Sequence, residues 1–227
     1  MNTILITGAN RGLGLEFVRS YVAEGARVHA CCRHPEKAKA LSEVAGDVVV
    51  HKLDVTDGLR VAGLARALAD EPIDILINNS GVFHRGAGDF GKIDFDSWVE
   101  ELKVNTVAPA RMVERFVEQV AASERKLIVN ISSGMGSIAL TASGDSVIYR
   151  SSKAGLNMVV RCLAHTLAER GITMVAISPG WVTTDMGGAK ADLTPADSIA
   201  KMRAVIDRLT LADTGRFFNH EGEERPW

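Results

Sequence analysis

The sequence contains little cysteine, little net charge and no long apolar run, and each of these scarcities excludes a class of protein. Its three cysteines are the adjacent pair Cys31 and Cys32 and the distant Cys162. An odd count without any metal-ligand spacing argues against a disulfide framework and a metal site, and predicts buried thiols in a reducing, cytoplasmic compartment. The formal net charge of −2 indicates no surface for nucleic acid or for an acidic membrane.

Long apolar segments are absent as well. No run approaches the length of about 18 residues that a membrane span needs. The first residues, MNTILITGAN, lack the basic start and the long apolar centre of a signal peptide. With 227 residues, 46% of them hydrophobic, the chain is long enough for one sizeable core but short for two. We therefore expect a single domain over residues 1–227, with no membrane partner.

Short apolar runs alternate with longer segments of helical period, which predict strands and helices in turn. The expected strands are 4–6, 27–32, 47–55, 73–79, 126–132, 173–179 and 216–218, and the expected helices are 12–24, 35–44, 58–70, 96–121, 149–170 and 195–209. Nearly all-apolar strands that alternate with helices favour an α/β fold of the Rossmann type: a doubly wound, mostly parallel seven-stranded sheet with helices on both faces. Pro109 should kink or divide the fourth of these helices.

The first strand–helix turn, TGANRGLG at residues 7–14, is rich in glycine. Gly8, Gly12 and Gly14 would let the backbone turn sharply and would let a pyrophosphate approach the free N–H groups at the helix N-terminus. The spacing differs from the common G-x-G-x-x-G, so the turn alone is also compatible with a tight connection that binds nothing. Together with the motifs below, it predicts a dinucleotide site.

The end of the second strand favours NADP(H) over NAD(H). A carboxylate there would accept a hydrogen bond from the 2′-hydroxyl of the adenosine ribose, but this chain has Cys32 and Arg33 and no acidic residue before Glu36. Arg33, together with Arg11 in the glycine-rich turn, would clamp a 2′-phosphate. NAD(H) stays possible, because an arginine such as Arg33 also occurs in solvated loops.

The stretch YRSSK at residues 149–153 places a tyrosine and a lysine four residues apart. On a helix, the two side chains lie on one face. An ammonium about 5 Å from a phenol, at an effective dielectric constant of about 20, favours the phenolate by roughly 3 kcal/mol. That would bring the pKa of Tyr149 from about 10 toward 7 or 8, so that it exchanges a proton with a carbonyl oxygen beside Lys153. An ordinary helix face is the alternative.

Taken in order along the chain, these motifs resemble the short-chain dehydrogenase/reductase family. The resemblance covers about residues 3–220, and its ordered motifs are TGANRGLG, Asp54-Val55, NNSG at 78–81, Asn105, Ser132-Ser133, YRSSK and SPGWVTTDMGG at 178–188. The segment GWVTTDMGG and the closing PW look similar to the small carbonyl-reductase and C-factor-like members of the family.

The resemblance implies a set of site residues and no metal. The catalytic residues would be Asn105, Ser133, Tyr149 and Lys153. Ser133 would polarise the substrate oxygen, Asn105 would hold a water beside Lys153, and Lys153 would bind the nicotinamide ribose. The residues expected to hold the cofactor are Gly8, Asn10, Arg11, Gly12, Leu13, Gly14, Arg33, Asp54, Val55, Asn78, Tyr149, Lys153, Pro179, Val182 and Thr184.

Two features of this site are left undecided by the sequence: which serine acts beside Tyr149, and which segments line the substrate pocket. Ser133 lies 16 residues before Tyr149, a longer interval than family members commonly have, and Ser137 competes for the same role. We favour Ser133 because it ends a predicted strand. The loop 181–194, beginning with Trp181, is expected to line or cover the substrate. A place for His84 at the border of the pocket is the less favoured interpretation, because the histidines show no ligand spacing and no nucleophile–base pair.

The sequence therefore predicts an NADP(H)-dependent oxidoreductase that interconverts a carbonyl and an alcohol, with a small-molecule substrate. One alternative is a cofactor-binding sensor or signalling protein with little turnover, since a fold does not fix a function. Another is a sugar-nucleotide epimerase or dehydratase, for which 227 residues leave no room for a substrate lobe. The resemblance also implies a homo-dimer or tetramer, paired through the predicted helices 96–121 and 149–170.

Overall fold

The strands form one fully parallel sheet. The computed structural model describes residues 1–227, and its strands are β1 (Thr3–Thr7), β2 (Arg27–Cys32), β3 (Val48–Lys52), β4 (Ile75–Asn78), β5 (Leu127–Ile131), β6 (Thr173–Ile177) and β7 (Phe217–Phe218). Their order is β3-β2-β1-β4-β5-β6-β7, and every neighbouring pair is parallel. The chain winds outward from β1 in one direction and from β4 in the other, which confirms the predicted doubly wound Rossmann fold.

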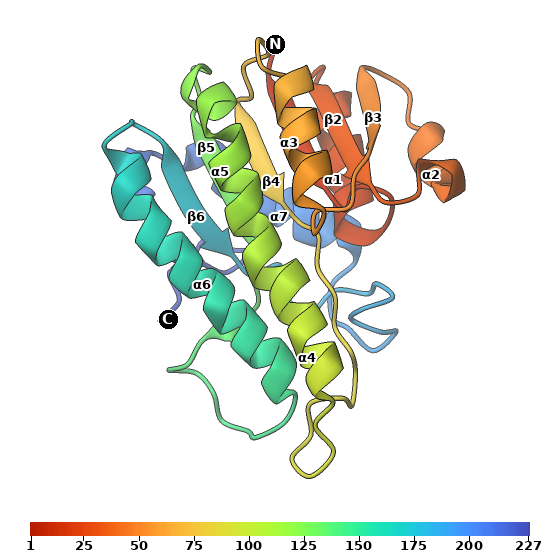
Figure 1. Cartoon of the computed structure of the whole chain (residues 1–227), viewed down its shortest axis with the longest axis vertical. Helices are drawn as coiled ribbons and strands as arrows, with labels where there is room; N and C mark the ends of the chain where they lie inside the picture. The colour runs from red at the N-terminus through yellow and green to blue at the C-terminus, as the bar shows by residue number, and fades with distance from the viewer.

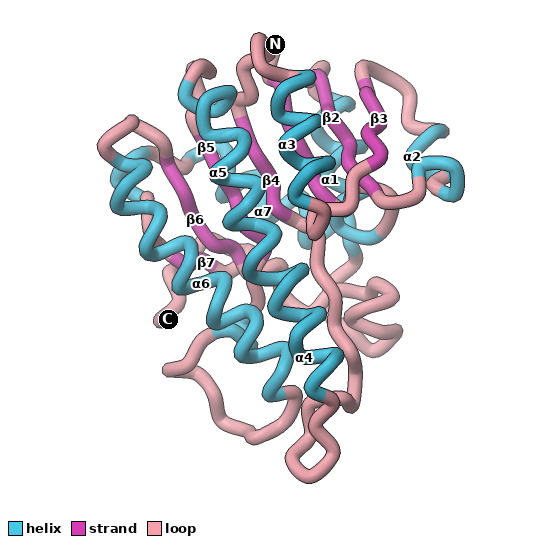
Figure 2. Tube along the Cα trace, in the orientation of Figure 1, coloured by secondary structure: helices cyan, strands magenta, loops and turns pink.

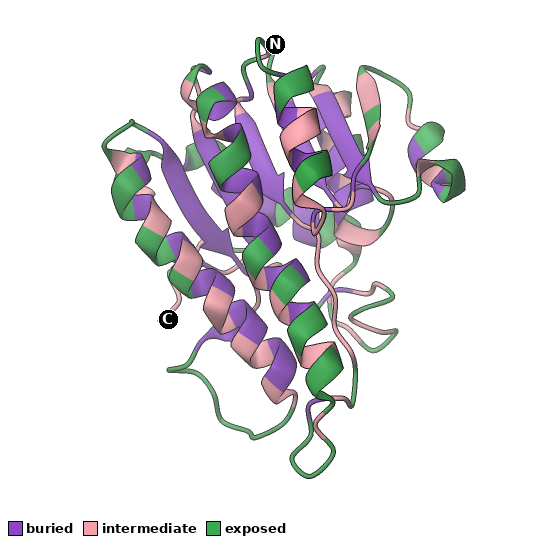
Figure 3. Ribbon diagram, in the orientation of Figure 1, coloured by how far each residue is buried: buried purple, intermediate pink, exposed green.

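The central strands are buried on both faces, as their apolar composition predicts. β4 (ILIN), β5 (LIVNI) and β6 (TMVAI) contain only buried residues, and Figure 3 shows them enclosed between helices. The edge strand β3 has only half-buried and exposed residues. Parallel strands need cover on both sides because connecting helices return across each face of the sheet.

Helices cover both faces of the sheet (Figure 1). One layer contains α3 (Gly58–Ala67), α4 (Phe95–Leu102), α5 (Ala108–Ala121) and α6 (Val147–Ala168), and the other contains α1 (Gly12–Ala23), α2 (Lys39–Ser42) and α7 (Pro195–Arg208). Successive strand side chains point to opposite faces. Leu5 therefore packs in the core under α5 and α6, whereas Ile4 and Ile6 pack in the core under α1 and α7.

Two predicted helices differ from those in the structure. Residues 35–44 form a 3-10 turn at Pro35–Lys37 followed by the four-residue α2, rather than one helix. The predicted helix 96–121 is divided into α4 and α5 by a π-helical turn at Lys103–Val107. Pro109 explains the division, because it has no N–H to donate to the carbonyl of Asn105 one turn earlier.

The C-terminal tail docks on the body of the protein. Ser137 Oγ donates a 2.7 Å hydrogen bond to the carbonyl of Pro226, and the backbone N–H of Ala139 donates one of 2.9 Å to Trp227. The Trp227 ring stacks on Phe217, with ring centroids 5.5 Å apart. The tail thus fixes the loop that follows β5.

The cysteines are all free thiols, but they are not all buried. Cys31 and Cys32 are buried in β2, whereas Cys162 is exposed on α6. The prediction of buried thiols is therefore wrong for Cys162, which lies on the solvent side of that helix. None of the helices combines the length and the apolarity that crossing a bilayer requires.

The longest loops gather beyond the carboxyl ends of the strands (Figure 2). They are residues 79–94 after β4, 132–146 after β5 and 178–194 after β6. Because all parallel strands end at the same edge of the sheet, these loops meet the glycine-rich turn that follows β1. A ligand site is expected at this edge, where the strand order reverses between β1 and β4.

Candidate active site

A cleft of about 590 Å³ opens at this edge of the sheet. Most of the cofactor residues predicted from the sequence line it: Gly8, Asn10, Arg11, Gly12, Leu13, Gly14, Arg33, Asp54, Val55, Tyr149, Lys153, Pro179 and Thr184. They come from the ends of several strands and from α6. The structure therefore brings together groups that lie up to 176 residues apart, from Gly8 to Thr184.

The glycine-rich turn forms one wall of the cleft. A Cβ on Gly14 would lie 2.1 Å from the carbonyl oxygen of Gly8, so only glycine allows α1 to begin this close to the turn. Gly8 itself has a φ of +66°, in the left-handed region. The N-cap residue of α1, Arg11, makes no side-chain capping bond, which leaves the first N–H groups of the helix available for an anion.

The asparagine that ends β4, Asn78, and the one that follows it, Asn79, have different positions. Asn79 lines the cleft, and its Nδ2 donates hydrogen bonds of 2.9 Å to the carbonyl of Thr7 and 3.2 Å to that of Gly8. Asn78 is 3% exposed, donates a 3.0 Å bond to Asn130 Oδ1 and does not line the cleft. Of the two, only Asn79 faces the cleft, because neighbouring residues along an extended chain point to opposite sides. The role of Asn78 at the cofactor stays a prediction.

The two arginines predicted to bind a 2′-phosphate differ in their partners. Arg11 forms a 2.9 Å ion pair with Asp185 from the loop after β6. Arg33 is exposed, lines the cleft and makes no ion pair or side-chain hydrogen bond. Burial acts to raise the pKa of Asp54. Two hydrogen bonds from Thr56 and the positive charge of Arg33 outweigh burial, so this pKa lies below its usual value. Arg33 is thus the cation that is free to meet an anion.

Tyr149 and Lys153 lie on the first turns of α6, on the same face of the helix. Lys153 Nζ is 5.8 Å from the centroid of the Tyr149 ring and donates a 2.9 Å hydrogen bond to the carbonyl of Ile131. Lys153 is only 4% exposed. Burial lowers its pKa to about 8, although the negative charge of Glu101 acts in the opposite direction. The predicted pairing of these two side chains is therefore present.

The pKa of Tyr149 does not follow the sequence-based expectation. Burial raises it to about 12, a hydrogen bond with Ser133 lowers it, and the charge of Glu101 raises it. The expected shift toward 7 or 8 is thus wrong for the polypeptide alone. Lys153 attracts a phenolate, but removing that phenolate from water costs more free energy, so the pKa of Tyr149 rises instead of falling.

The structure separates the two candidate serines. Ser133, two residues beyond β5, lies close enough to the Tyr149 phenol to lower its pKa, and its Oγ accepts a 3.1 Å bond from the backbone N–H of Met135. Ser137 is fully buried and donates to the carbonyl of Pro226 in the tail. The serine beside Tyr149 is therefore Ser133, and Ser137 anchors the C-terminus.

Asn105 lies in the π-helical turn and does not line the cleft. Its Oδ1 accepts a 2.9 Å hydrogen bond from the backbone N–H of Val82. Its Nδ2 donates bonds of 2.9 Å to the carbonyl of Val82 and to Ser152 Oγ. The side chain thus ties the segment after β4 to α6, directly beside Lys153.

The loop after β6 crosses one side of the cleft. Thr184 and Met186 line the cleft, and Trp181 Nε1 donates a 2.9 Å bond to the carbonyl of Gly187. Arg85, from the loop after β4, donates a 3.0 Å bond to the carbonyl of Met186. Val182 is 5% exposed and is not among the residues that line the cleft, and its contact with the cofactor stays a prediction.

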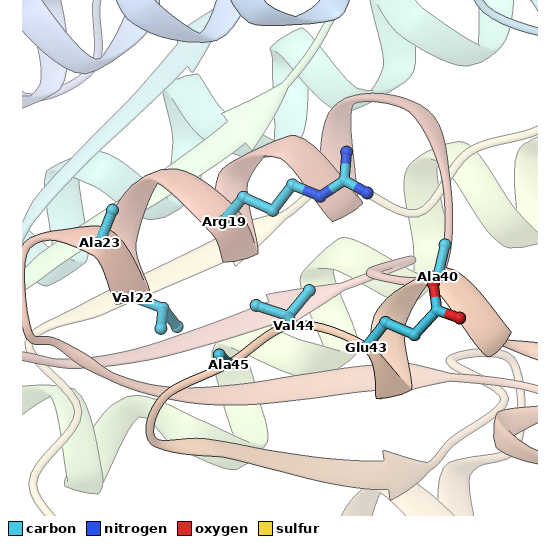
Figure 4. A pocket seen from close by; sticks show the side chains of 7 residues that line it. All are labelled: Arg19, Val22, Ala23, Ala40, Glu43, Val44 and Ala45. Atoms are coloured by element: carbon cyan, nitrogen blue, oxygen red, sulfur yellow. The ribbon is translucent and has the colours of Figure 1, made fainter.

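A second, smaller hollow of about 240 Å³ lies between α1 and α2 (Figure 4). It is lined by Arg19, Val22, Ala23, Ala40, Glu43, Val44 and Ala45, none of which lines the large cleft. It contains no pair of groups suited to proton transfer. No group of three or more histidine, cysteine or acidic side chains is arranged to hold a metal ion.

Sequence reasoning missed several groups at the site. Asn79 and Thr56 line the cleft, and only the repeated asparagine in NNSG signalled the first. His84 is not among the residues that line the cleft, as the favoured interpretation of the sequence had it, and contacts the buried carboxylate of Glu101. Glu101 was not among the predicted site residues. A charged residue one helical turn before Asn105, on a face of the helix that is buried, is nevertheless unusual.

Known proteins with the same pattern agree with this geometry. The model of the short chain dehydrogenase family matches residues 2–193. The C-signal protein of Myxococcus xanthus is 37% identical over 156 residues, covering 69% of this chain and 93% of that protein. The NADPH-bound carbonyl reductase from chicken fatty liver has 34% identity and a TM-score of 0.93, covering 100% of this chain and 99% of that one.

A second solved structure is similar over its full length. Carbonyl reductase Sniffer of D. melanogaster has 29% identity and a TM-score of 0.94, covering 100% of both chains. The resemblance noted in the motifs is therefore confirmed both by sequence and by fold. The chain belongs to the short-chain dehydrogenase/reductase family and is an oxidoreductase of that type.

Proposed function

We propose that the chain is an NADP(H)-dependent carbonyl reductase, which interconverts an aldehyde or ketone and the corresponding alcohol. The observation that carries this proposal is the placement of the Tyr149 phenol, near Ser133 and beside Lys153, in the cleft that the glycine-rich turn opens. Two carbonyl reductases that share the fold over the whole chain support it.

The residues of the cleft fit a dinucleotide with a 2′-phosphate. The close approach of Gly14 to Gly8 and the free N-terminus of α1 suit a pyrophosphate. The unpaired guanidinium of Arg33 suits a further phosphate on the adenosine ribose. The chicken enzyme is described as NADPH-bound. NADP(H) is therefore the preferred cofactor, because NAD(H) would leave Arg33 without its phosphate.

The residues of the chain itself hold and transfer the proton of the reaction. When bound, the nicotinamide cofactor supplies or accepts the hydride. In the reducing direction, Tyr149 donates its phenolic proton to the substrate oxygen, and the hydroxyl of Ser133 stabilises the charge that develops there. Lys153 has one N–H engaged with Ile131 and keeps its others for the ribose hydroxyls and for a water.

The water expected beside Lys153 is better placed at the backbone of Asn105 than at its side chain. Both N–H groups of its side chain are already used, on Val82 and Ser152. The backbone carbonyl, in contrast, lacks its ordinary helical donor because residue 109 is proline. We therefore assign to that carbonyl the water that would return a proton to Lys153.

A test of the function follows the absorbance of NADPH with a panel of aldehydes, ketones and diketones. We expect turnover with at least one of them, and we expect Tyr149→Phe to lose at least about a hundredfold in kcat because general-acid catalysis contributes about that much. NADPH binding should stay within about threefold, since no charge is removed at the phosphates. Full turnover in Tyr149→Phe would refute the assignment of the proton donor.

A signalling or sensor protein is the second candidate, and the similarity to C-signal favours it. It predicts tight NADPH binding with no turnover on any carbonyl. The same panel therefore distinguishes the two functions.

Three further properties belong to this proposal. The whole chain, residues 1–227, would act as a single nucleotide-binding domain. It would work in the cytoplasm, as its free thiols suggest. It would form a homo-dimer or tetramer through α4, α5 and α6, and sedimentation or light scattering would test this.

A further inference from the structure

A buried carboxylate lies next to the proposed catalytic pair. Glu101, near the end of α4, is 0% exposed. Its Oε1 accepts a 2.6 Å hydrogen bond from the backbone N–H of His84 and lies 3.2 Å from His84 Nδ1. Its Oε2 is buried and has no hydrogen-bond partner. Acidic side chains are rarely buried in this way, because removing the charge from water costs several kcal/mol.

The carboxylate holds a short segment that touches Tyr149. Asn105 bonds both backbone groups of Val82, and Glu101 bonds the backbone N–H of His84. Phe83, between these two residues, packs its ring against that of Tyr149, with centroids 4.6 Å apart. Two side chains from successive turns, one in α4 and one in the π-helical turn, therefore fix the backbone on either side of the ring that supports the phenol.

The charge of Glu101 also acts on both proposed catalytic groups. It raises the pKa of Lys153 against the larger, lowering effect of burial, and it adds to the effect of burial that raises the pKa of Tyr149. The groups that act on Glu101 itself are His84 and Lys153. Both shifts keep a proton on the pair.

His84 connects this carboxylate to the surface. The His84 side chain is 33% exposed, and its Nε2 lies 3.4 Å from the exposed carboxylate of Glu100. The carboxylate of Asp94, at the N-cap of α4, is also influenced by the charge of His84. The groups around the catalytic pair are therefore Glu101 and His84 inside and Glu100 and Asp94 at the rim.

We propose that Glu101, braced by His84, is a positioning residue of the active site: it holds Phe83 against Tyr149, and its negative charge keeps the Tyr149–Lys153 pair protonated. The inference rests on the proposed function, since it concerns the proton that Tyr149 donates. A structural role alone would need only an acceptor for the N–H of His84, and a neutral glutamine would supply that equally well.

The first test is therefore Glu101→Gln, with kcat and KM for a reduced carbonyl measured across pH. Loss of the negative charge lowers the pKa of both Tyr149 and Lys153. Reduction needs the protonated phenol, so activity should fall at lower pH than in the wild type. We expect the alkaline limb of the kcat profile to move down by about one pH unit. KM should change by less than about threefold, because no substrate contact is removed.

The matched control is Asp96→Asn, which removes an exposed carboxylate from the same helix. Its alkaline limb should coincide with that of the wild type. A second variant, His84→Ala, removes the brace but leaves the Glu101 carboxylate ionised at alkaline pH, so kcat should fall while the alkaline limb stays in place. If Glu101→Gln likewise lowers kcat equally at every pH and leaves the limb in place, Glu101 is only a structural acceptor and the proposal is wrong.

A second readout needs neither cofactor nor turnover. The chain has two tyrosines, Tyr21 and Tyr149, and burial raises the pKa of Tyr21 even further than that of Tyr149. The first phenolate to absorb in the near ultraviolet during an alkaline titration is therefore Tyr149, which Tyr149→Phe verifies. Circular dichroism at each point confirms that the helices persist.

The titration separates failure of this inference from failure of the proposed function. Glu101→Gln should bring Tyr149 ionisation to lower pH, even if the wild type reduces no carbonyl in the panel. An unmoved phenol titration would overturn the role of Glu101, even if the wild type is an active reductase.

Discussion

Replacement of Arg33 by alanine should weaken NADPH binding and leave NADH binding almost unchanged. The two cofactors differ only in the 2′-phosphate, and Arg33 is an unpaired guanidinium at the cleft. A hydrogen bond to a charged group contributes about 1.5 to 3 kcal/mol. Because Arg33 is exposed and screened by water, the lower end of that range applies, which corresponds to about a tenfold increase in the Kd of NADPH.

Arg11 provides an internal comparison. Its guanidinium is already paired with Asp185 at 2.9 Å, so a phosphate must compete with that carboxylate. We expect Arg11→Ala to raise the Kd of NADPH by only about twofold to threefold. Conversely, Asp185→Asn frees Arg11, and an exposed ion pair of up to about 1 kcal/mol implies up to about fivefold tighter NADPH binding.

The assay is a fluorescence titration of each variant with NADPH and with NADH at two ionic strengths. Higher salt should bring the Kd values of NADPH and NADH closer together in the wild type, since surface charges are screened over about 10 Å at moderate salt. It should have little effect on the ratio of these Kd values in Arg33→Ala. Equal losses of NADPH and NADH in Arg33→Ala would refute the phosphate assignment. If Arg11→Ala raises the Kd of NADPH more than Arg33→Ala does, the ion pair with Asp185 does not keep Arg11 from the phosphate.

Three further predictions, each with its own substitutions, test the packing and the proton chemistry. Gly14→Ala puts a Cβ 2.1 Å from the Gly8 oxygen, so it should lower stability by about 1 to 3 kcal/mol and weaken NADPH binding; Gly63→Ala, whose Cβ meets nothing within 4 Å, is the calorimetric control. Ser133→Ala should lower kcat about a hundredfold with little change in Tm, whereas Ser137→Ala should lower Tm and spare kcat. Burial lowers the pKa of Lys153 from 10.5 to about 8, so the wild type gains stability as pH rises through that window. Lys153→Met should therefore unfold at higher urea than the wild type below pH 8, and this advantage should shrink toward pH 10.5.

The sequence predicted those features that short stretches of chain determine. The glycine-rich turn, the alternation of strands and helices, and the shared face of Tyr149 and Lys153 all depend on residues within a few positions of one another. The doubly wound order was predicted from the general right-handedness of crossover connections. The division of the helix at Pro109 is equally local, because a missing N–H breaks the bond to the residue four positions earlier.

Features that depend on register or on burial could not be predicted in this way. Asn78 and Asn79 are identical in type, and only the strand's final position decides which of them faces the cleft. The pairing of Glu101 with His84 joins two elements 17 residues apart. The ion pair of Arg11 with Asp185 spans 174 residues, so no local pattern could indicate it.

The raised pKa of Tyr149 bears on the direction of the reaction. In the reducing direction the phenol must carry its proton, and with a pKa of about 12 it does so throughout the neutral range. In the oxidising direction the phenolate must accept a proton from the alcohol, and the raised pKa makes that phenolate a minor species at neutral pH. Burial disfavours the phenolate, and the charge of Glu101 disfavours it further. We therefore infer that the polypeptide is built as a proton donor, and that oxidation of an alcohol should become appreciable only at alkaline pH.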